Sequence, residues 1–192
     1  PLNLGAHMSS PNAERIRFLR ASWASLLVGT AAVVCLALPQ FSDTLLFRRA
    51  ELAAGEYWRL WTGHLVHFGW RHLLADLMVF LTAGVWLESF ARWTTRGFLI
   101  LAPAAISTFL DLADPQLTFY GGLSGVLHAG VAAAALWLVA RERGRRQWIG
   151  AAILAALLVK LLGESPWGPA LQLREGWNIA IAPFAHASGM LA

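Results

Sequence analysis

The sequence predicts an all-α membrane protein, a bundle of six transmembrane helices, and three observations lead to this fold class. Of the 192 residues, 57% are hydrophobic and only 14% are charged, which leaves too little polar surface to cover one soluble core. The chain contains six apolar runs suited to crossing a bilayer. Ten tryptophans suit the membrane interfaces, where amphipathic rings gather. The lipid bilayer is therefore the expected surroundings of this protein.

The expected elements follow one another as spans joined by short loops, with one longer connection. The spans are Ala21–Pro39, His72–Ala91, Gly97–Ala113, Gly122–Ala140, Trp148–Gly163 and a sixth from Ile179 onward. Residues 40–71, between the first two spans, are rich in aromatic and charged side chains, which favours an interfacial loop with short helices. Residues 1–10 resemble a tag or leader, and residues 11–192 form one domain. We expect the sixth helix to continue past Ala192.

Arginine positions predict the orientation of the bundle. Arginines precede the first span, separate the second span from the third, and separate the fourth from the fifth, so that all three groups lie on one side. The positive-inside rule makes that side cytoplasmic and places the N-terminus there. Arginines at helix ends act as topology signals, so no nucleic-acid partner is expected. The second, fourth and sixth spans then all begin at the outer face.

A serine among glycines opens the fourth span. The run from Gly121 to Gly125 lets the backbone turn sharply and lets a neighbouring helix or a substrate approach Ser124 closely. Serines flanked by glycines are also common where membrane helices pack against one another. This motif alone therefore does not indicate catalysis.

A histidine in the sixth span supplies a chemical partner for that serine. His186 lies in an apolar helix, and an ionisable side chain inside a membrane requires a polar neighbour. A serine hydroxyl becomes a useful nucleophile when a base removes its proton, and imidazole titrates near the required pH. Ser124 as nucleophile and His186 as base thus explain each other. His128, one turn after Ser124, either stacks on His186 or is a packing histidine.

Histidines and an acid gather near the start of the second span. His64, His67, His72 and Asp76 are residue types that bind zinc, and the last two share a helix face. The zincin pattern His-Glu-x-x-His is absent from the sequence, and a serine with its base accounts for hydrolysis without metal, so neither a metal nor another cofactor is expected. Fixed donors around a developing oxyanion contribute most to acyl transfer. His72 and the Ser124 backbone N–H are the candidate donors.

Together these motifs resemble the signature of the rhomboid intramembrane serine proteases. The matching patterns are His67-Phe68-x-x-x-His72-x-x-x-Asp76, Gly122-x-Ser124-Gly125, His186-x-x-Gly189 and the Trp58-Arg59 pair of the first loop. The resemblance implies a rhomboid-like bundle with an interfacial loop between helices 1 and 2. It also implies a serine endopeptidase with a Ser/His dyad and no third carboxylate. Residues that would support the site are His72, Asp76, His67, His128, Gly122 and Gly125.

The short six-span form is similar to the rhombosortase branch of that family, which is thought to process proteins with a C-terminal Gly-Gly sorting tail. This similarity implies cleavage of transmembrane segments or sorting tails near the outer face of the membrane. It also implies the bacterial inner membrane, with the active site toward the periplasm. The expected partners are a membrane-protein substrate and the lipid bilayer, and the sequence leaves the oligomeric state open.

Asp76 departs from the family pattern, because many rhomboids carry an asparagine there that donates to the oxyanion. An ionised carboxylate would repel that oxyanion. Either Asp76 is kept protonated by its apolar setting, or it hydrogen-bonds His72 and keeps that ring charged. We favour the second arrangement.

Two other function classes fit parts of the sequence. A noncatalytic rhomboid-like protein would use the same spans to bind membrane proteins, but such relatives usually lack the serine or the histidine. A proton path through the histidines and Asp76 would need titratable groups in the inner half of the bundle as well. The sequence offers only Glu88 there.

Overall fold

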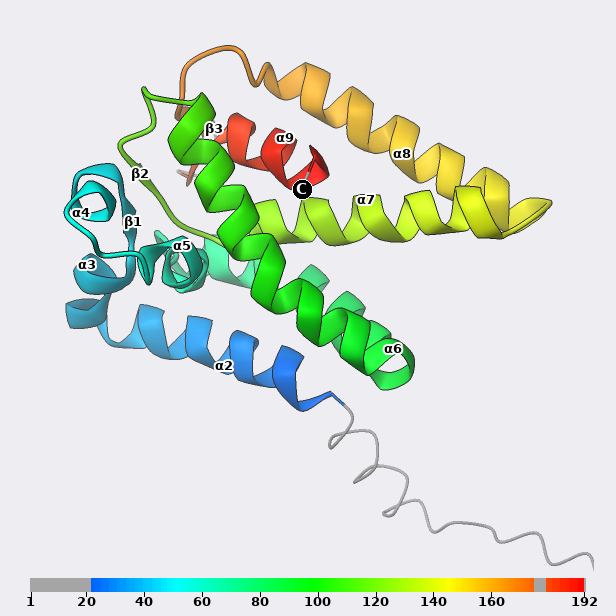
Figure 1. Cartoon of the computed structure of the whole chain (residues 1–192), viewed down its shortest axis with the longest axis horizontal. Coiled ribbons are helices and arrows are strands. Elements are labelled where there is room, and N and C mark those ends of the chain that lie inside the picture. The colour runs from blue at the N-terminus through cyan, green and yellow to red at the C-terminus, as the bar shows by residue number, and fades with distance from the viewer. Residues whose placement is uncertain (1–21, 175–178, 192) are drawn as a thin grey trace, which may run out of the picture.

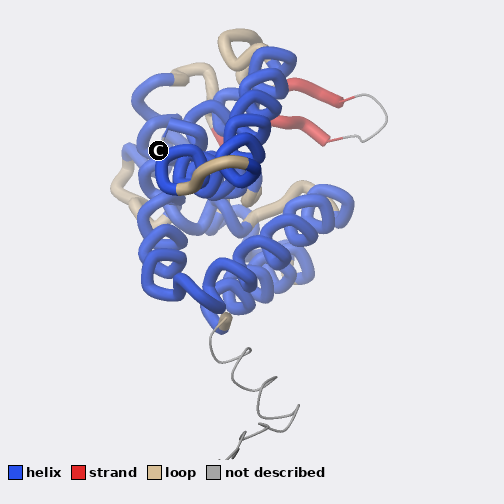
Figure 2. Tube along the Cα trace, turned by 90° about the vertical axis from the view of Figure 1, so that its right-hand side faces the viewer, coloured by secondary structure: helices blue, strands red, loops and turns tan. Residues whose placement is uncertain are grey.

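Helices dominate the structure, a computed structural model that describes residues 22–174 and 179–191. The longer helices are α2 (Trp23–Ala37), α6 (Trp70–Ala113), α7 (Ser124–Arg141) and α8 (Arg145–Glu164), and the last helix is α9 (Pro183–Leu191). They pack side by side, with α9 lying beside α7 and α8 (Figure 1). Strands β3 (Gln172–Arg174) and β4 (Ile179–Ile181) form a hairpin that projects from this bundle (Figure 2).

Four helices in the described part of the chain are long and apolar enough to cross a membrane. They are Trp70–Ser89, Ala91–Ala113, Ser124–Arg141 and Arg145–Glu164. The first two are the halves of α6, which breaks at Ala91 because this residue has non-helical angles of φ −122° and ψ 43°. A fifth span results if α2 and the following segment Pro39–Leu45, bent by 101°, count as one. A mostly helical protein is thus confirmed, with four to five candidate spans among the described residues where the sequence predicted six.

The sixth predicted span begins later than the sequence suggested. Residues 179–181 form strand β4, and helix α9 begins only at Pro183 and has nine residues. The alternation of Ile179 and Ile181 suits an extended strand, since β-branched side chains favour that conformation. Proline suits the first position of a helix, where its missing N–H has no partner to lose. The helix predicted from Ile179 is therefore wrong at its start.

Short helices fill the first loop, as predicted for residues 40–71. They are η1 (Pro39–Phe41), α3 (Ser42–Leu45), α4 (Arg49–Ala53), α5 (Arg59–Thr62) and η2 (Gly63–Leu65), with strand β1 (Phe47–Arg48) among them. Arg59 is buried and donates to the carbonyls of Asp43 and Leu46 at 2.8 and 2.6 Å. Strand β1 pairs with β2 (Phe119–Tyr120), just before α7. The loop is therefore fixed against the segment that leads into Ser124.

His64 connects this loop to the second half of α6. Its Nε2 lies 3.0 Å from both the Pro103 carbonyl oxygen and the Ser107 hydroxyl. Burial lowers the pKa of His64 to about 4, because desolvation penalises the charged ring. The ring is therefore neutral at pH 7 and serves to pack the loop onto the bundle.

Glu88, on the first half of α6, joins α2 to α6. Its carboxylate accepts hydrogen bonds from the Ser25 backbone N–H and hydroxyl at 2.8 and 2.9 Å, and from Arg96 Nε at 2.7 Å. The first N–H groups of a helix have no partner within the helix, and a carboxylate there also complements the helix dipole. Glu88 therefore caps the first turn of α2. This structural role explains why an acid is buried here, and no role in proton transfer is needed to explain it.

Helices α7 and α9 approach each other closely where small residues face one another. A Cβ added to Gly189 would collide with the backbone carbonyl of Gly125 and lie 3.3 Å from the Ala129 nitrogen. Ala185, one turn before Gly189, is fully buried. Small side chains let the backbones of membrane helices pack directly. Only glycine fits position 189 at this separation, so this contact sets the spacing of the two helices.

We predict that Gly189→Ala lowers the free energy of unfolding by about 1 to 3 kcal/mol, because the methyl group forces the two backbones apart. Gly97→Ala is the matched control, since a Cβ at Gly97 meets nothing within 4 Å and alanine favours a helix. Thermal unfolding in detergent measures both variants. Equal stability of the parent and Gly189→Ala would contradict the tight contact.

Candidate active site

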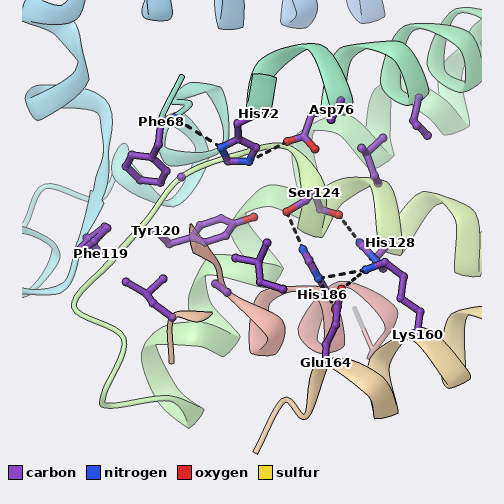
Figure 3. Close-up of a pocket in the computed structure, with 17 residues that line it drawn as sticks. Phe68, His72, Asp76, Phe119, Tyr120, Ser124, His128, Lys160, Glu164 and His186 are labelled. Atoms are coloured by element: carbon purple, nitrogen blue, oxygen red, sulfur yellow. Dashed lines mark hydrogen bonds and ion pairs between the residues drawn. The ribbon is translucent and has the colours of Figure 1, made fainter. Parts of the chain in front are cut away.

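A cavity of about 570 Å³ lies between the starts of α6 and α7, the end of α8 and helix α9 (Figure 3). Its polar and ionisable lining residues are His72, Asp76, Tyr120, Ser124, His128, Lys160, Glu164 and His186. The other lining residues are mostly apolar. A largely apolar cavity with a few convergent polar groups is the usual form of a binding or catalytic site. Residues predicted from separate spans therefore meet in one place.

The serine and the histidine singled out by the sequence are in hydrogen-bonding contact. Ser124 is the first residue of α7, and its Oγ lies 3.0 Å from Nε2 of His186 on α9. The His186 side chain is almost fully buried. A hydroxyl that donates to an imidazole nitrogen is the arrangement in which a base takes the proton from a nucleophile. The geometry therefore suits nucleophilic attack by Ser124 Oγ.

A third side chain, which the sequence analysis did not select, completes this row. Glu164, the last residue of α8, places Oε2 2.7 Å from His186 Nδ1. Its other oxygen, Oε1, accepts a hydrogen bond from Lys160 Nζ at 2.6 Å. The resemblance implied no third carboxylate, whereas a buried one contacts the base here. A usable signal in the sequence was the chain's single lysine, Lys160, which lies four residues before an acid at the end of an apolar run.

His128 lies against the face of the His186 ring, whereas Glu164 contacts the edge of that ring at Nδ1. The two imidazole rings stack, with centroids 4.2 Å apart and planes 14° apart. The Nδ1–H of His128 donates to the Ser124 backbone carbonyl at 2.7 Å. Because that nitrogen is held by the first turn of α7, the ring forms a fixed wall against which His186 rests.

The segment before Ser124 is held in a turn by Tyr120. The tyrosine hydroxyl donates to the Gly122 carbonyl at 2.9 Å and accepts from the Gly125 N–H at 3.3 Å. Burial raises the pKa of Tyr120 above its usual range, so the hydroxyl keeps the proton that it donates. Gly122 has a φ of +119°, and a Cβ there would lie 2.8 Å from His72 Nε2. Gly122 therefore allows both the turn and the close approach of His72.

His72, Asp76 and His67 form a second polar group on the other side of Ser124. Asp76 Oδ2 lies 3.5 Å from His72 Nε2 and 3.2 Å from His67 Nε2. The Phe68 N–H points at His72 Nδ1 at 3.5 Å, so His72 carries its proton on Nε2, facing the cavity and Asp76. The favoured contact of Asp76 with His72 is present, and His67 shares the same carboxylate oxygen. The charged His72 ring expected from that contact is not, because the His72 Nδ1 that accepts the Phe68 N–H carries no proton.

The second nitrogen of His67 determines how many protons the pair of His67 and Asp76 holds. His67 Nδ1–H donates to the Leu65 carbonyl at 3.1 Å, so a hydrogen bond from Nε2 to Asp76 requires one further proton. That proton makes either an imidazolium with a carboxylate or a neutral imidazole with a carboxylic acid. Both arrangements carry no net charge. Either one removes the repulsion that an isolated Asp76 carboxylate would exert on an oxyanion.

The same three residues are the one group among the described residues whose donor atoms are close enough to hold a metal ion. The atoms of His67, His72 and Asp76 lie within 4.8 Å of one another, and His64 is not part of this group. Hydrogen bonds to one another and to the backbone already use these atoms. The expectation that the site needs no metal or other cofactor stays a prediction.

Comparison with protein families decides which family this fold and cavity represent. The Rhomboid domain family matches residues 54–192, which is more than half of the chain. The chain belongs to the rhomboid family. The match includes every residue of the cavity described above. A search of curated proteins found no match. Membership in a family of intramembrane serine proteases agrees with a multi-pass helical protein that has a serine and an imidazole in contact.

The stack of His128 on His186 in this rhomboid can be tested by substitution. We predict that His128→Ala slows the reaction of Ser124 with a serine-directed fluorophosphonate probe about two- to tenfold, since a ring pair is worth about 0.5 to 1.5 kcal/mol. His128→Phe loses the same hydrogen bond but keeps a ring, and should react faster than His128→Ala. If the two variants react equally fast, stacking does not position His186 and His128 only packs the helix.

Proposed function

We propose that this rhomboid is an intramembrane serine endopeptidase that uses Ser124 and His186. The observation that supports the proposal most strongly is the 3.0 Å contact between Ser124 Oγ and His186 Nε2 inside a cavity of about 570 Å³. These two polar side chains come from distant parts of the sequence and meet at hydrogen-bonding distance. Packing of α7 against α9 alone would require neither of them. The family match supports the same reaction class.

The proposed reaction is acyl transfer through the serine. His186 Nε2 takes the proton from Ser124 Oγ as the oxygen attacks the substrate's peptide carbonyl, and the carbonyl oxygen becomes an oxyanion. Collapse of this intermediate breaks the C–N bond, and His186 gives the proton to the departing amine. Water activated by His186 then hydrolyses the acyl-enzyme and frees Ser124. No metal or cofactor is needed for these steps.

Donors near the start of α7 would stabilise the oxyanion. The Ser124 backbone N–H belongs to the first turn of the helix, whose N–H groups lack helical acceptors and lie at the positive end of the helix dipole. His72 Nε2–H faces the same cavity from α6. The pairing of His67 with Asp76 keeps a net negative charge away from this point. This arrangement supports the role predicted for His72.

The proposed substrates are transmembrane segments or C-terminal sorting tails of membrane-tethered proteins. The site forms at the beginnings of the span Trp70–Ser89 and of α7, so it lies near one membrane surface rather than at mid-depth. The arginine pattern makes that surface the outer one, with the N-terminus inside, in a bacterial inner membrane. Three parts of this proposal rest on the sequence alone: the rhombosortase branch, the Gly-Gly tail, and a complete six-span bundle with an interfacial first loop.

Labelling with a fluorophosphonate probe tests the proposed nucleophile and base. We predict that the detergent-solubilised parent is labelled, whereas Ser124→Ala is not labelled because the nucleophilic oxygen is absent. His186→Ala should react at least about 100-fold more slowly, because the hydroxyl keeps its proton. The labelled protein is measured by gel fluorescence against time.

Asn3→Ala and the parent serve as controls for expression and purification. Thermal unfolding confirms that each variant is folded. A folded parent that does not react with the probe would contradict the protease and favour a rhomboid that binds membrane proteins without cleaving them. Equal labelling of the parent and Ser124→Ala would show that another residue reacts.

A further inference from the structure

We infer that Glu164 acts as the positioning acid of the site, so that Ser124, His186 and Glu164 work as a triad and Lys160 holds the acid. The inference rests on the proposed function and goes beyond the serine–histidine pair. Three helices supply the three residues: α7, α9 and α8 in that order. Figure 3 shows His186 lying between Ser124 and Glu164, with dashed contacts on both sides of its ring.

The hydrogen-bond pattern assigns the His186 tautomer. For Ser124 to donate its proton, His186 Nε2 must carry a lone pair, so the proton of the neutral ring lies on Nδ1. That Nδ1–H donates to Glu164 Oε2 at 2.7 Å, a length typical of a bond to a charged acceptor. The carboxylate therefore selects the tautomer that the reaction requires. It also fixes the rotation of the ring about its side-chain bonds.

Lys160 anchors this carboxylate from the far side. It lies one turn before Glu164 on α8, and its Nζ is 2.6 Å from Oε1, so the two carboxylate oxygens serve different partners. Glu164 is 4% exposed, and burying a carboxylate is costly unless a cation and hydrogen bonds accompany it. The Gln172 amide also donates to the Glu164 backbone carbonyl at 2.9 Å, which fixes the end of the helix.

The charge of Glu164 matters most when the serine proton moves. His186 then becomes an imidazolium, and the buried carboxylate 2.7 Å away stabilises that charge. The other groups that face His186 are His128 and Ser124 on α7, Lys160 at 3.5 Å from Nδ1, and His72 across the cavity. Among these described neighbours, Glu164 is the negatively charged one. Its removal should therefore disfavour the imidazolium.

A purely structural role is the alternative for Glu164, since the same contacts also hold α8 against α9. The two roles differ in their consequences for chemistry. A structural acid affects stability and the amount of folded protein. A positioning acid also changes how the rate depends on pH, because it stabilises one protonation state of His186 over the other. Stability and the pH–rate profile therefore separate the two roles.

The test compares Glu164→Gln and Glu164→Asp in the full chain in detergent, by the second-order rate of fluorophosphonate labelling between pH 5 and pH 9. Glu164→Gln keeps the shape of the side chain but removes the charge, and should slow labelling at neutral pH about tenfold or more. Its acid limb should move to lower pH. Glu164→Asp restores the charge at a shorter reach and should regain part of the rate.

Asp111→Asn is the matched control. It removes another partly buried acid, which pairs with Arg49 at 2.6 Å in the last turn of α6 and does not line the cavity. This variant should keep the parent's rate and pH profile even where its unfolding midpoint falls. The triad would be supported if Glu164→Gln is labelled more slowly than the parent while it loses no more stability than Asp111→Asn.

Two results would overturn the inference. One is a Glu164→Gln rate and profile equal to those of the parent, and the other is a lower rate with an unchanged profile and no recovery in Glu164→Asp. Both leave the proposed protease intact, since the parent would still be labelled and Ser124→Ala would not. A parent that is not labelled, in contrast, would overturn the proposed function itself.

Discussion

The close contact of α7 with α9 is the constraint on which the rest of the site depends. Gly189 rests against the Gly125 backbone, so the two helices approach at the distance that only glycine allows. At that distance Ser124, at the start of α7, reaches His186, one turn before Gly189. A single added methyl group at this contact would separate Ser124 Oγ from His186 Nε2. Helix packing and chemistry are therefore set by the same pair of backbones.

Satisfied polar groups explain how such a site persists in an apolar bundle. Each ionisable side chain around the cavity has partners: Glu164 contacts His186 and Lys160, and Asp76 contacts two histidines. An unpartnered polar group in this setting costs several kcal/mol, about as much as a whole domain can lose before unfolding. The network thus stabilises the fold and also orients the side chains of the candidate site. Away from the site, the hydrogen bonds of Glu88 with α2 and Arg96 stabilise the fold only.

The sequence predicted the spans and the residues of the site better than it predicted their connections. Apolar length and arginine position identify membrane helices directly, and a serine with a histidine in such helices points to chemistry. The strand before α9 was missed because Ile179 and Ile181 are equally apolar in a helix or a strand. Glu164 was missed because its role depends on where α8 ends relative to His186, which is a property of the packed helices and not of local spacing.

Cleavage of a membrane-embedded substrate tests the central claim most directly. The purified chain and its Ser124→Ala variant would be reconstituted in liposomes with a single-span protein that ends in a Gly-Gly tail, and the fragments weighed by mass spectrometry. The account predicts cuts by the parent alone, at bonds near the outer end of the substrate helix or in its tail. Intact substrate after incubation with a folded, probe-reactive parent would contradict it, as would the same fragments from Ser124→Ala.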